Sequence, residues 1–141
     1  MSEKPNILVI VPDQMRFDMV DLHGTSALEL PNIHSLFQDS VVFKRAYCTQ
    51  SLCTPARGSL MSGLYPHQHG SLYNKTALPA DTQCFPEMLP DCDYHTAYNG
   101  KWHLGDSAQP QKGFSYWHLF PYGGGGYFNG YFIRNGRIER D

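Results

Sequence analysis

A cysteine, a proline and an arginine stand close together in the stretch SLCTPARGSL, residues 51–60. Proline is favoured in the first turn of a helix, so a helix over residues 55–62 would begin just after Cys53. The unpaired backbone N–H groups and the positive dipole end at a helix N-terminus bind anions and favour a thiolate. Arg57 would add a positive charge there. The pattern favours a reactive sulfur that faces an anionic substrate; the alternative is a buried cysteine beside a surface arginine.

Asp13 and Gln14 come directly after a short apolar run, residues 7–11. If this run is a strand of a parallel sheet, the two side chains lie at the carboxyl end of the strand, where ligands bind in such sheets. Carboxylate and amide oxygens are hard ligands that suit Ca²⁺ or Mg²⁺. The alternative is an ordinary turn that ends the strand, and for this pair alone the turn is the more frequent case.

Lys101 and His103 lie in the stretch GKWHLG, residues 100–105, after another expected strand. Residues two apart in an extended segment point the same way, so an ammonium and an imidazole could face one anion. The alternative is a glycine-bounded loop with a solvated lysine. For a similar pair, His67 and His69, we favour a structural role over a zinc site shared with cysteines.

These residues need a framework of alternating strands and helices. Apolar and β-branched runs predict strands over residues 6–11, 41–47 and 94–98, the last ended by Asn99-Gly100. Prolines and apolar spacing predict helices over residues 31–37 and 55–62. Residues 113–141 are rich in glycine and aromatic residues without a clear period, so we expect an irregular tail. The alternation predicts an α/β fold with a largely parallel sheet, whose edge would bring the candidate residues together.

The composition excludes several classes of function. The 141 residues are the usual size of one domain, and 41% hydrophobic with 17% charged residues indicates a globular chain. The net charge of −2 argues against nucleic acid or an anionic membrane as a partner. The apolar run near the N-terminus is shorter than a signal peptide or membrane span requires, so we expect a cytoplasmic protein.

The cysteine pattern points away from structural metal sites. None of the four cysteines forms a C-x-x-C pair, which argues against a structural zinc site, and a reducing compartment argues against disulfides. Three of the cysteines, Cys48, Cys84 and Cys92, are expected to be buried apolar filler.

The motifs together resemble those of one enzyme family. CTPAR, residues 53–57, resembles the C-x-P-x-R signature of the type I sulfatases, within the alkaline phosphatase superfamily. NILVIVPDQ, residues 6–14, resembles the first strand and metal-binding acidic pair of that family, and GKWHLG is similar to its second hallmark. The likeness runs from about residue 5 to residue 133, with the motifs in the family's order. It implies an alkaline phosphatase-like mixed or parallel sheet flanked by helices.

The resemblance also implies a reaction. In such enzymes a formylglycine-generating enzyme oxidises the motif cysteine, so Cys53 would become an aldehyde whose hydrate attacks a sulfate ester. Arg57 would hold this hydrate, Lys101 would bridge it to the sulfate, and His103 would orient or deprotonate it. The substrate would be a sulfated small molecule or a sulfated glycan.

The metal site implied by the resemblance consists of Asp13, Gln14 and the group made from Cys53. These residues would bind Ca²⁺, with Mg²⁺ as an alternative, and the ion would polarise the sulfate. Gln14 stands where many members of the family have a second aspartate, and Ala56 replaces the serine that is most common at its position.

The length of the chain leads to a further expectation. Family members are several times longer, and their remaining metal ligands and other site residues lie in the part that follows. We therefore expect residues 1–141 to be the N-terminal part of a sulfatase catalytic domain, inactive and marginally folded by itself. Two alternatives stay open: a phosphonate or phosphate monoester hydrolase of the same superfamily, and a non-catalytic truncated remnant.

Overall fold

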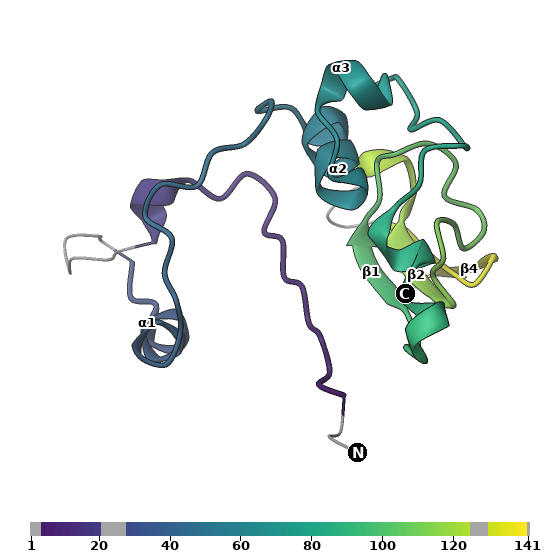
Figure 1. The fold of residues 1–141 in the computed structure, drawn as a ribbon. Coiled ribbons are helices and arrows are strands. Elements are labelled where there is room, and N and C mark those ends of the chain that lie inside the picture. Colours follow the sequence, from purple (N-terminus) through teal and green to yellow (C-terminus); the bar gives the residue numbers. More distant parts are fainter. Residues whose placement is uncertain (1–3, 21–27, 125–129, 141) are drawn as a thin grey trace. The chain divides into compact units, whose positions relative to one another are not determined.

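The structure is a computed structural model that describes residues 4–20, 28–124 and 130–140. The chain divides into two compact units, residues 1–46 and residues 47–141 (Figure 1). Within the described ranges, no helix combines the length and the apolar character needed to cross a membrane.

The first unit contains two short helices. The 3₁₀ helix η1 spans Phe17–Met19 and the α-helix α1 spans Pro31–Gln38. Pro31 occupies the first turn of α1, where its missing N–H has no intrahelical partner to lose. The helix predicted over residues 31–37 is therefore confirmed.

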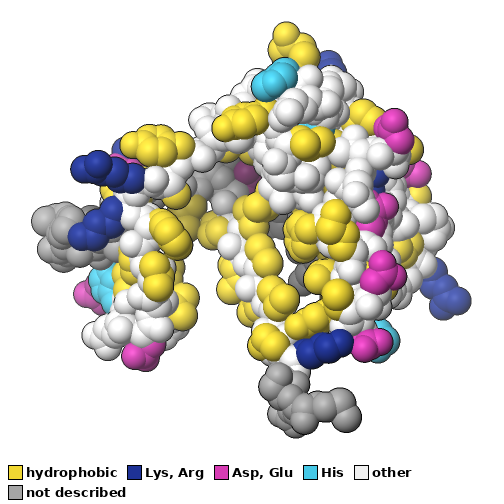
Figure 2. All heavy atoms as spheres, in the orientation of Figure 1, with side chains coloured by type: hydrophobic (Ala, Val, Ile, Leu, Met, Phe, Trp, Pro, Cys, Tyr) yellow, Lys and Arg dark blue, Asp and Glu magenta, His cyan; other side chains and the backbone are white. Residues whose placement is uncertain are grey.

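The strands predicted over residues 6–11 and 41–47 are wrong. Residues 6–11 are extended but belong to no described strand, and their apolar side chains stay open to solvent, from 48% exposed at Val11 to 83% at Leu8. Figure 2 shows hydrophobic side chains following this segment, which is the purple part of the ribbon in Figure 1. Lys44 and Arg45 form a turn inside the second stretch. An apolar pattern favours a strand, but a strand forms only where a neighbour accepts its backbone hydrogen bonds.

The second unit begins with the helix that carries the cysteine motif. Helix α2 spans Cys53–Ser62 and ends at Gly63, which adopts a left-handed conformation (φ 73°). The helix begins two residues before the predicted start, so Cys53 lies in the first turn and not outside it. The shorter helices α3 (Pro66–His69), η2 (Phe85–Glu87) and η3 (Pro90–Cys92) follow.

A mixed four-stranded sheet forms the rest of this unit. Its strands lie in the order β1 (Ala97–Lys101), β2 (Tyr116–Phe120), β3 (Tyr131–Arg134) and β4 (Arg137–Arg140). The β1 and β2 strands pair in parallel, and the other two pairs are antiparallel. A 3₁₀ helix, η4 (Pro121–Gly123), follows β2. A mixed sheet with helices confirms the α/β class, but the largely parallel sheet expected from the alternation of elements is wrong for these four strands, of which one pair is parallel and two are antiparallel.

Two strand predictions in this region need correction. The strand expected over residues 94–98 is displaced toward the C-terminus: β1 begins at Ala97 and continues through Asn99-Gly100 to Lys101. The tail from residue 113 onward is not irregular, since it supplies β2, β3 and β4. Asn135 and Gly136 both have positive φ, 46° and 84°, as a tight hairpin turn between β3 and β4 requires.

The core of the second unit lies against one face of this sheet. Among the described residues, eight buried hydrophobic side chains form this core: Met61, Leu78, Cys84, Trp102, Leu104, Trp117, Leu119 and Ile133. Cys84 therefore fits the prediction of a buried filler, whereas Cys48 and Cys92 are exposed and contradict it. All four cysteines lie in the described part of the chain, and none of them forms a disulfide.

Candidate functional site

The N-terminus of α2 is held in place by a threonine inside the cysteine motif. The Thr54 side chain is 1% exposed, and its hydroxyl donates to the His103 carbonyl at 2.8 Å and more distantly to the Asn74 carbonyl at 3.3 Å. The Thr54 backbone N–H donates to the Asn74 side-chain oxygen at 3.1 Å. Because Leu52, the residue that precedes the helix, makes no side-chain cap, Asn74 supplies the cap from a distant loop.

Lys101, the last residue of β1, reaches the first residue of α2. Its ammonium nitrogen donates to the Cys53 sulfur at 3.4 Å, and both side chains are partly buried. In this position the sulfur stands for the reacting group that the motif would carry. The contact brings together two predicted site residues that are 48 positions apart in the sequence.

Arg57 joins the same group of residues one helical turn after Cys53. One guanidinium nitrogen donates to the backbone carbonyl of Lys101 and to the Tyr98 hydroxyl, at 3.1 Å for the latter. The Tyr98 hydroxyl donates in turn to the same Lys101 carbonyl. Arg57 is therefore fixed between α2 and the end of β1 and does not extend into solvent as a surface cation would.

The position of His103 does not depend on the extended segment that was predicted. Its φ of 57° is left-handed, so Lys101 and His103 do not share a regular extended segment. The imidazole packs instead against Gly123 in η4, where an added Cβ would lie 2.3 Å from the imidazole Cδ2. A side chain at Gly123 would displace the ring, so this glycine is part of what positions His103.

Asp13 and Gln14 lie in the first unit. They form an exposed turn in which Gln14 has a left-handed backbone, with φ 58°. Their oxygen donors fit a hard divalent cation. Among the described residues no group of three or more His, Cys, Asp or Glu side chains could hold a metal ion. The metal-binding role of this pair therefore stays a prediction.

The histidine pair of YPHQHG divides into a buried and an exposed residue. His69 is 2% exposed, and its Nδ1 accepts from the backbone N–H of Ser71 at 3.2 Å. The proton of a neutral ring is then on Nε2, which lies 3.3 Å from the Ser59 hydroxyl oxygen. These contacts support the structural role favoured for His69. His67 is exposed and stacks on Tyr65, with 5.9 Å between ring centroids.

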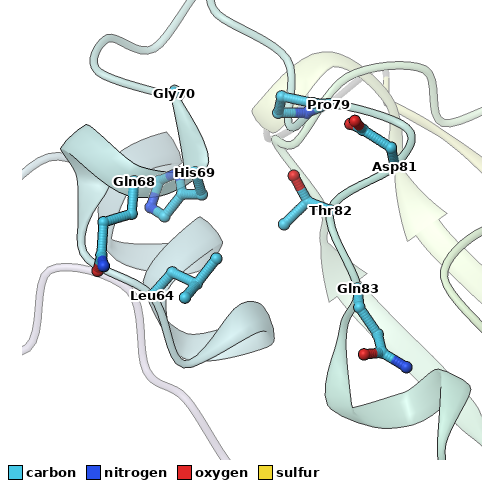
Figure 3. Close-up of a pocket in the computed structure, with 8 residues that line it drawn as sticks. All are labelled: Leu64, Gln68, His69, Gly70, Pro79, Asp81, Thr82 and Gln83. Atoms are coloured by element: carbon cyan, nitrogen blue, oxygen red, sulfur yellow. The ribbon is translucent and has the colours of Figure 1, made fainter.

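A pocket of about 450 Å³ lies between α3 with its flanking residues and the loop over residues 79–83 (Figure 3). His69 and Gln68 line it on the α3 side, and Asp81 and Gln83 line it from the loop across the opening. None of the predicted site residues contributes to this pocket, so it is separate from the Cys53 group.

Four residues that contact the predicted group were missed in the sequence. They are Thr54, Asn74, Tyr98 and Gly123. Tyr98 could have been suspected because it is a polar-tipped aromatic residue in an expected strand, just before GKWHLG. Burial raises the pKa of Tyr98, while the adjacent Arg57 acts in the opposite direction. The Thr54 and Asn74 contacts join distant parts of the chain and leave no local pattern.

The arrangement around Cys53 suits chemistry on an anion. The N-terminus of α2 and the Lys101 ammonium meet at the partly buried Cys53, and the Lys101 carbonyl holds the Arg57 guanidinium one helical turn later. Fixed donors and positive charges of this kind stabilise negative charge that develops in a transition state.

Comparison with known proteins gives consistent matches. The family model described as Sulfatase matches residues 5–128. An ulvan-active sulfatase of Formosa agariphila is 35% identical over 121 residues, which cover 81% of this chain and 24% of that protein. Human steryl-sulfatase is 31% identical over 145 residues, which cover 95% of this chain and 24% of that protein.

A solved structure agrees with the sequence matches. The structure of BT4656 in complex with its substrate, D-glucosamine-2-N,6-O-disulfate, superposes with a TM-score of 0.61 at 29% identity and covers 67% of this chain and 19% of that one. The fold shared with such neighbours is alkaline phosphatase-like, as expected. The chain thus spans about a quarter of the length of the two relatives above, and over this span it belongs to the sulfatase family.

Proposed function

We propose that this protein is a sulfuric ester hydrolase whose nucleophile is a formylglycine made from Cys53. The observation that carries the proposal is the Lys101 ammonium 3.4 Å from the Cys53 sulfur at the N-terminus of α2, with Arg57 held one helical turn later by the Lys101 carbonyl. Membership of the sulfatase family implies both a formylglycine and a divalent metal. A cation beside a partly buried nucleophile, with a second cation one helical turn later, stabilises the negative charge that develops as an anionic ester is hydrolysed.

Each residue of the group has a role that follows from its contacts. One hydroxyl of the formylglycine hydrate attacks the sulfur of the ester and displaces the alcohol, and the second hydroxyl then expels sulfate and restores the aldehyde, which water hydrates again. Lys101 reaches the first residue of α2 and neutralises charge on the sulfate as the ester bond breaks. Arg57 donates toward the end of β1 and holds the hydrate in one orientation. His103, held against Gly123, takes or returns a proton at an imidazole nitrogen.

We propose Ca²⁺ as the metal, with Mg²⁺ as an alternative. Asp13, Gln14 and the group made from Cys53 would hold it, because carboxylate and amide oxygens are hard ligands. When bound, the ion supplies Lewis-acid polarisation of the sulfate. Ligands beyond this pair are needed for the usual coordination number of Ca²⁺.

The proposed substrate class is a sulfated glycan. The ulvan-active sulfatase and the disulfated glucosamine bound to BT4656 support this class, whereas the steryl-sulfatase supports a sulfated small molecule. The proposed partner in maturation is a formylglycine-generating enzyme, which would act on Cys53.

The test uses the full-length gene product, co-expressed with a formylglycine-generating enzyme. Mass spectrometry of the peptide over residues 46–57 measures the conversion of Cys53, and turnover of 4-nitrophenyl sulfate is compared with that of an aryl phosphonate monoester. We expect an aldehyde at position 53, a preference for the sulfate ester, and no turnover in Cys53→Ala. A preference for the phosphonate would support the related phosphonate hydrolase, and an inactive protein with an intact thiol would contradict the proposal.

A further inference from the structure

The hydroxyl of Tyr98 occupies a central position in the Cys53 group. It accepts a hydrogen bond from the Arg57 guanidinium at 3.1 Å and donates one to the Lys101 carbonyl. The same carbonyl accepts from Arg57, so three groups close a small hydrogen-bonded ring. Two of the three belong to residues that the proposed function places at the reacting centre.

The ring of Tyr98 is held from several sides by other aromatic side chains. It meets Trp102 edge-on with 5.2 Å between ring centroids, Phe114 edge-on at 5.2 Å, and Trp117 at 5.4 Å. Trp102 and Trp117 are buried core residues, at 1% and 0% exposed. A ring packed in this way has little freedom to turn. The core therefore fixes the position of the Tyr98 hydroxyl, independently of its hydrogen bond with Arg57.

The protonation state of Tyr98 suits both of its contacts. Burial raises the pKa of the phenol, so the hydroxyl keeps its proton at neutral pH. It can then donate to the Lys101 carbonyl and still accept from Arg57. A phenylalanine would keep the ring contacts and lose both hydrogen bonds.

We propose that Tyr98 is a positioning residue, which fixes the Arg57 guanidinium and the backbone of Lys101 beside Cys53. The catalytic consequence of this inference rests on the proposed function. The hydrogen bonds of Tyr98 do not depend on it. Without the hydroxyl, Arg57 has one acceptor fewer and the Lys101 carbonyl loses one of its two donors. Both effects misplace charges that must lie within a few tenths of an ångström of the reacting group.

The test compares Tyr98→Phe with Tyr116→Phe in the full-length protein. Tyr116 is a matched control because it lies on the neighbouring strand β2 and is 41% exposed. The first readout is the hydrogen exchange of the Arg57 guanidinium protons by NMR, with the signals assigned through Arg57→Lys. We expect exchange at least about 3-fold faster in Tyr98→Phe and unchanged in Tyr116→Phe, because a hydrogen bond that is removed no longer protects these protons. Unchanged exchange in Tyr98→Phe overturns the proposal.

The second readout is the kinetics of 4-nitrophenyl sulfate hydrolysis, per mole of formylglycine. We expect kcat of Tyr98→Phe to fall by about 10- to 100-fold with KM nearly constant, because a misplaced catalytic group weakens the transition state more than the ground state. In an Arg57→Lys background the same change should have a smaller effect, since the action through Arg57 is already lost and only the contact with the Lys101 carbonyl remains. Equal kcat values, or an undiminished loss in that background, overturn the positioning role.

The two readouts also separate this inference from the proposed function. The full-length protein without substitutions, matured at Cys53, is compared with Tyr98→Phe in both readouts. If it has no sulfatase turnover while exchange of the Arg57 protons responds to Tyr98→Phe, the contact is real and the proposed function has failed. If turnover is present and neither readout responds, the proposed function stands and the role of Tyr98 is wrong.

Discussion

The ammonium nitrogen of Lys101 lies 3.4 Å from the sulfur of Cys53, although 48 positions separate these residues in the sequence. The contact joins the carboxyl end of β1 to the N-terminus of α2. Two elements that the local sequence specifies independently thus meet at the position where the family carries its nucleophile.

Removing the charge of Lys101 should slow hydrolysis strongly. Lys101→Met keeps most of the side-chain volume and removes the ammonium that lies beside Cys53. We expect kcat for 4-nitrophenyl sulfate to fall by about 100- to 1000-fold, the usual loss when one group that stabilises the transition state is removed. Lys75→Met serves as the control, because Lys75 is exposed. An equal kcat per mole of formylglycine in both variants would contradict the role of Lys101.

The hydroxyl of Thr54 should contribute to stability. Thr54→Val keeps the shape of the side chain but leaves the His103 carbonyl without the donor that lies 2.8 Å away. We expect the free energy of unfolding to fall by about 1–3 kcal/mol, the cost of burying an unsatisfied polar group. Chemical denaturation of Thr54→Val and Thr54→Ser measures this, and the serine variant should lose less because it keeps the hydroxyl. A valine variant as stable as the serine variant would show that the contact contributes nothing.

A side chain at Gly58 should disturb the contact between α2 and His69. A Cβ at this position would lie 2.7 Å from the imidazole Cε1, closer than van der Waals contact allows. We expect Gly58→Ala to lower the free energy of unfolding by about 1–3 kcal/mol, in spite of the better helix propensity of alanine.

Gly124→Ala is the control for the Gly58 variant. Among the described residues, no atom lies within 4 Å of a Cβ at Gly124, and its φ of 166° is open to any residue. We expect its thermal unfolding to match that of the unmodified protein. Similar melting of both alanine variants would mean that His69 moves aside without cost.

The cysteines should differ in reactivity toward iodoacetamide. Cys84 is 0% exposed, and burial raises the pKa of its thiol even though Lys112 acts to lower it. Cys48 and Cys92 are exposed. At pH 8 we expect mass spectrometry to find the two exposed thiols alkylated while Cys84 stays protected until the protein is unfolded. Early alkylation of Cys84 in the folded protein would contradict its burial.

Alkaline pH should reduce stability through Tyr98. Because burial raises the pKa of Tyr98 above its value of 10.0 in the unfolded chain, the folded state binds more protons than the unfolded state above that pH. The contribution is fully present below pH 10.0 and is lost as the pH rises through the folded pKa. Urea unfolding of the unmodified protein and Tyr98→Phe at pH 8 and above pH 10 measures it. The difference in stability between the two proteins should shrink at the higher pH, and a constant difference would contradict the raised pKa.

Several features could be predicted from short stretches of sequence because their causes are local. A proline in the first turn and apolar residues at helical spacing were enough to predict α1, and the same signals placed α2 to within two residues of its start. The motif residues Cys53, Arg57, Lys101 and His103 could be named in the same way, because the C-x-P-x-R and GKWHLG stretches carry their own signature.

Strands were harder to predict, because a strand depends on a partner that may be far along the chain. Residues 6–11 have the composition of a buried strand, yet no described strand pairs with them. The glycine- and aromatic-rich tail has no regular period, yet it forms three strands, since β2 finds a parallel neighbour in β1 and the Asn135-Gly136 turn closes β3 on β4. The propensity of a strand is local, but its hydrogen bonds are not.

The sequence by itself was enough to predict which groups would carry the chemistry: a cysteine in a helix-starting motif, an arginine one turn later, and a lysine and a histidine in a second motif. Only the tertiary structure decided what holds them. Tyr98 ties Arg57 to Lys101, and Thr54 ties α2 to the His103 carbonyl. Except for the bond from Tyr98 to Lys101, these hydrogen bonds join residues that are more than 40 positions from each other in the sequence. They form only when the packing of the core brings α2 and the end of β1 together.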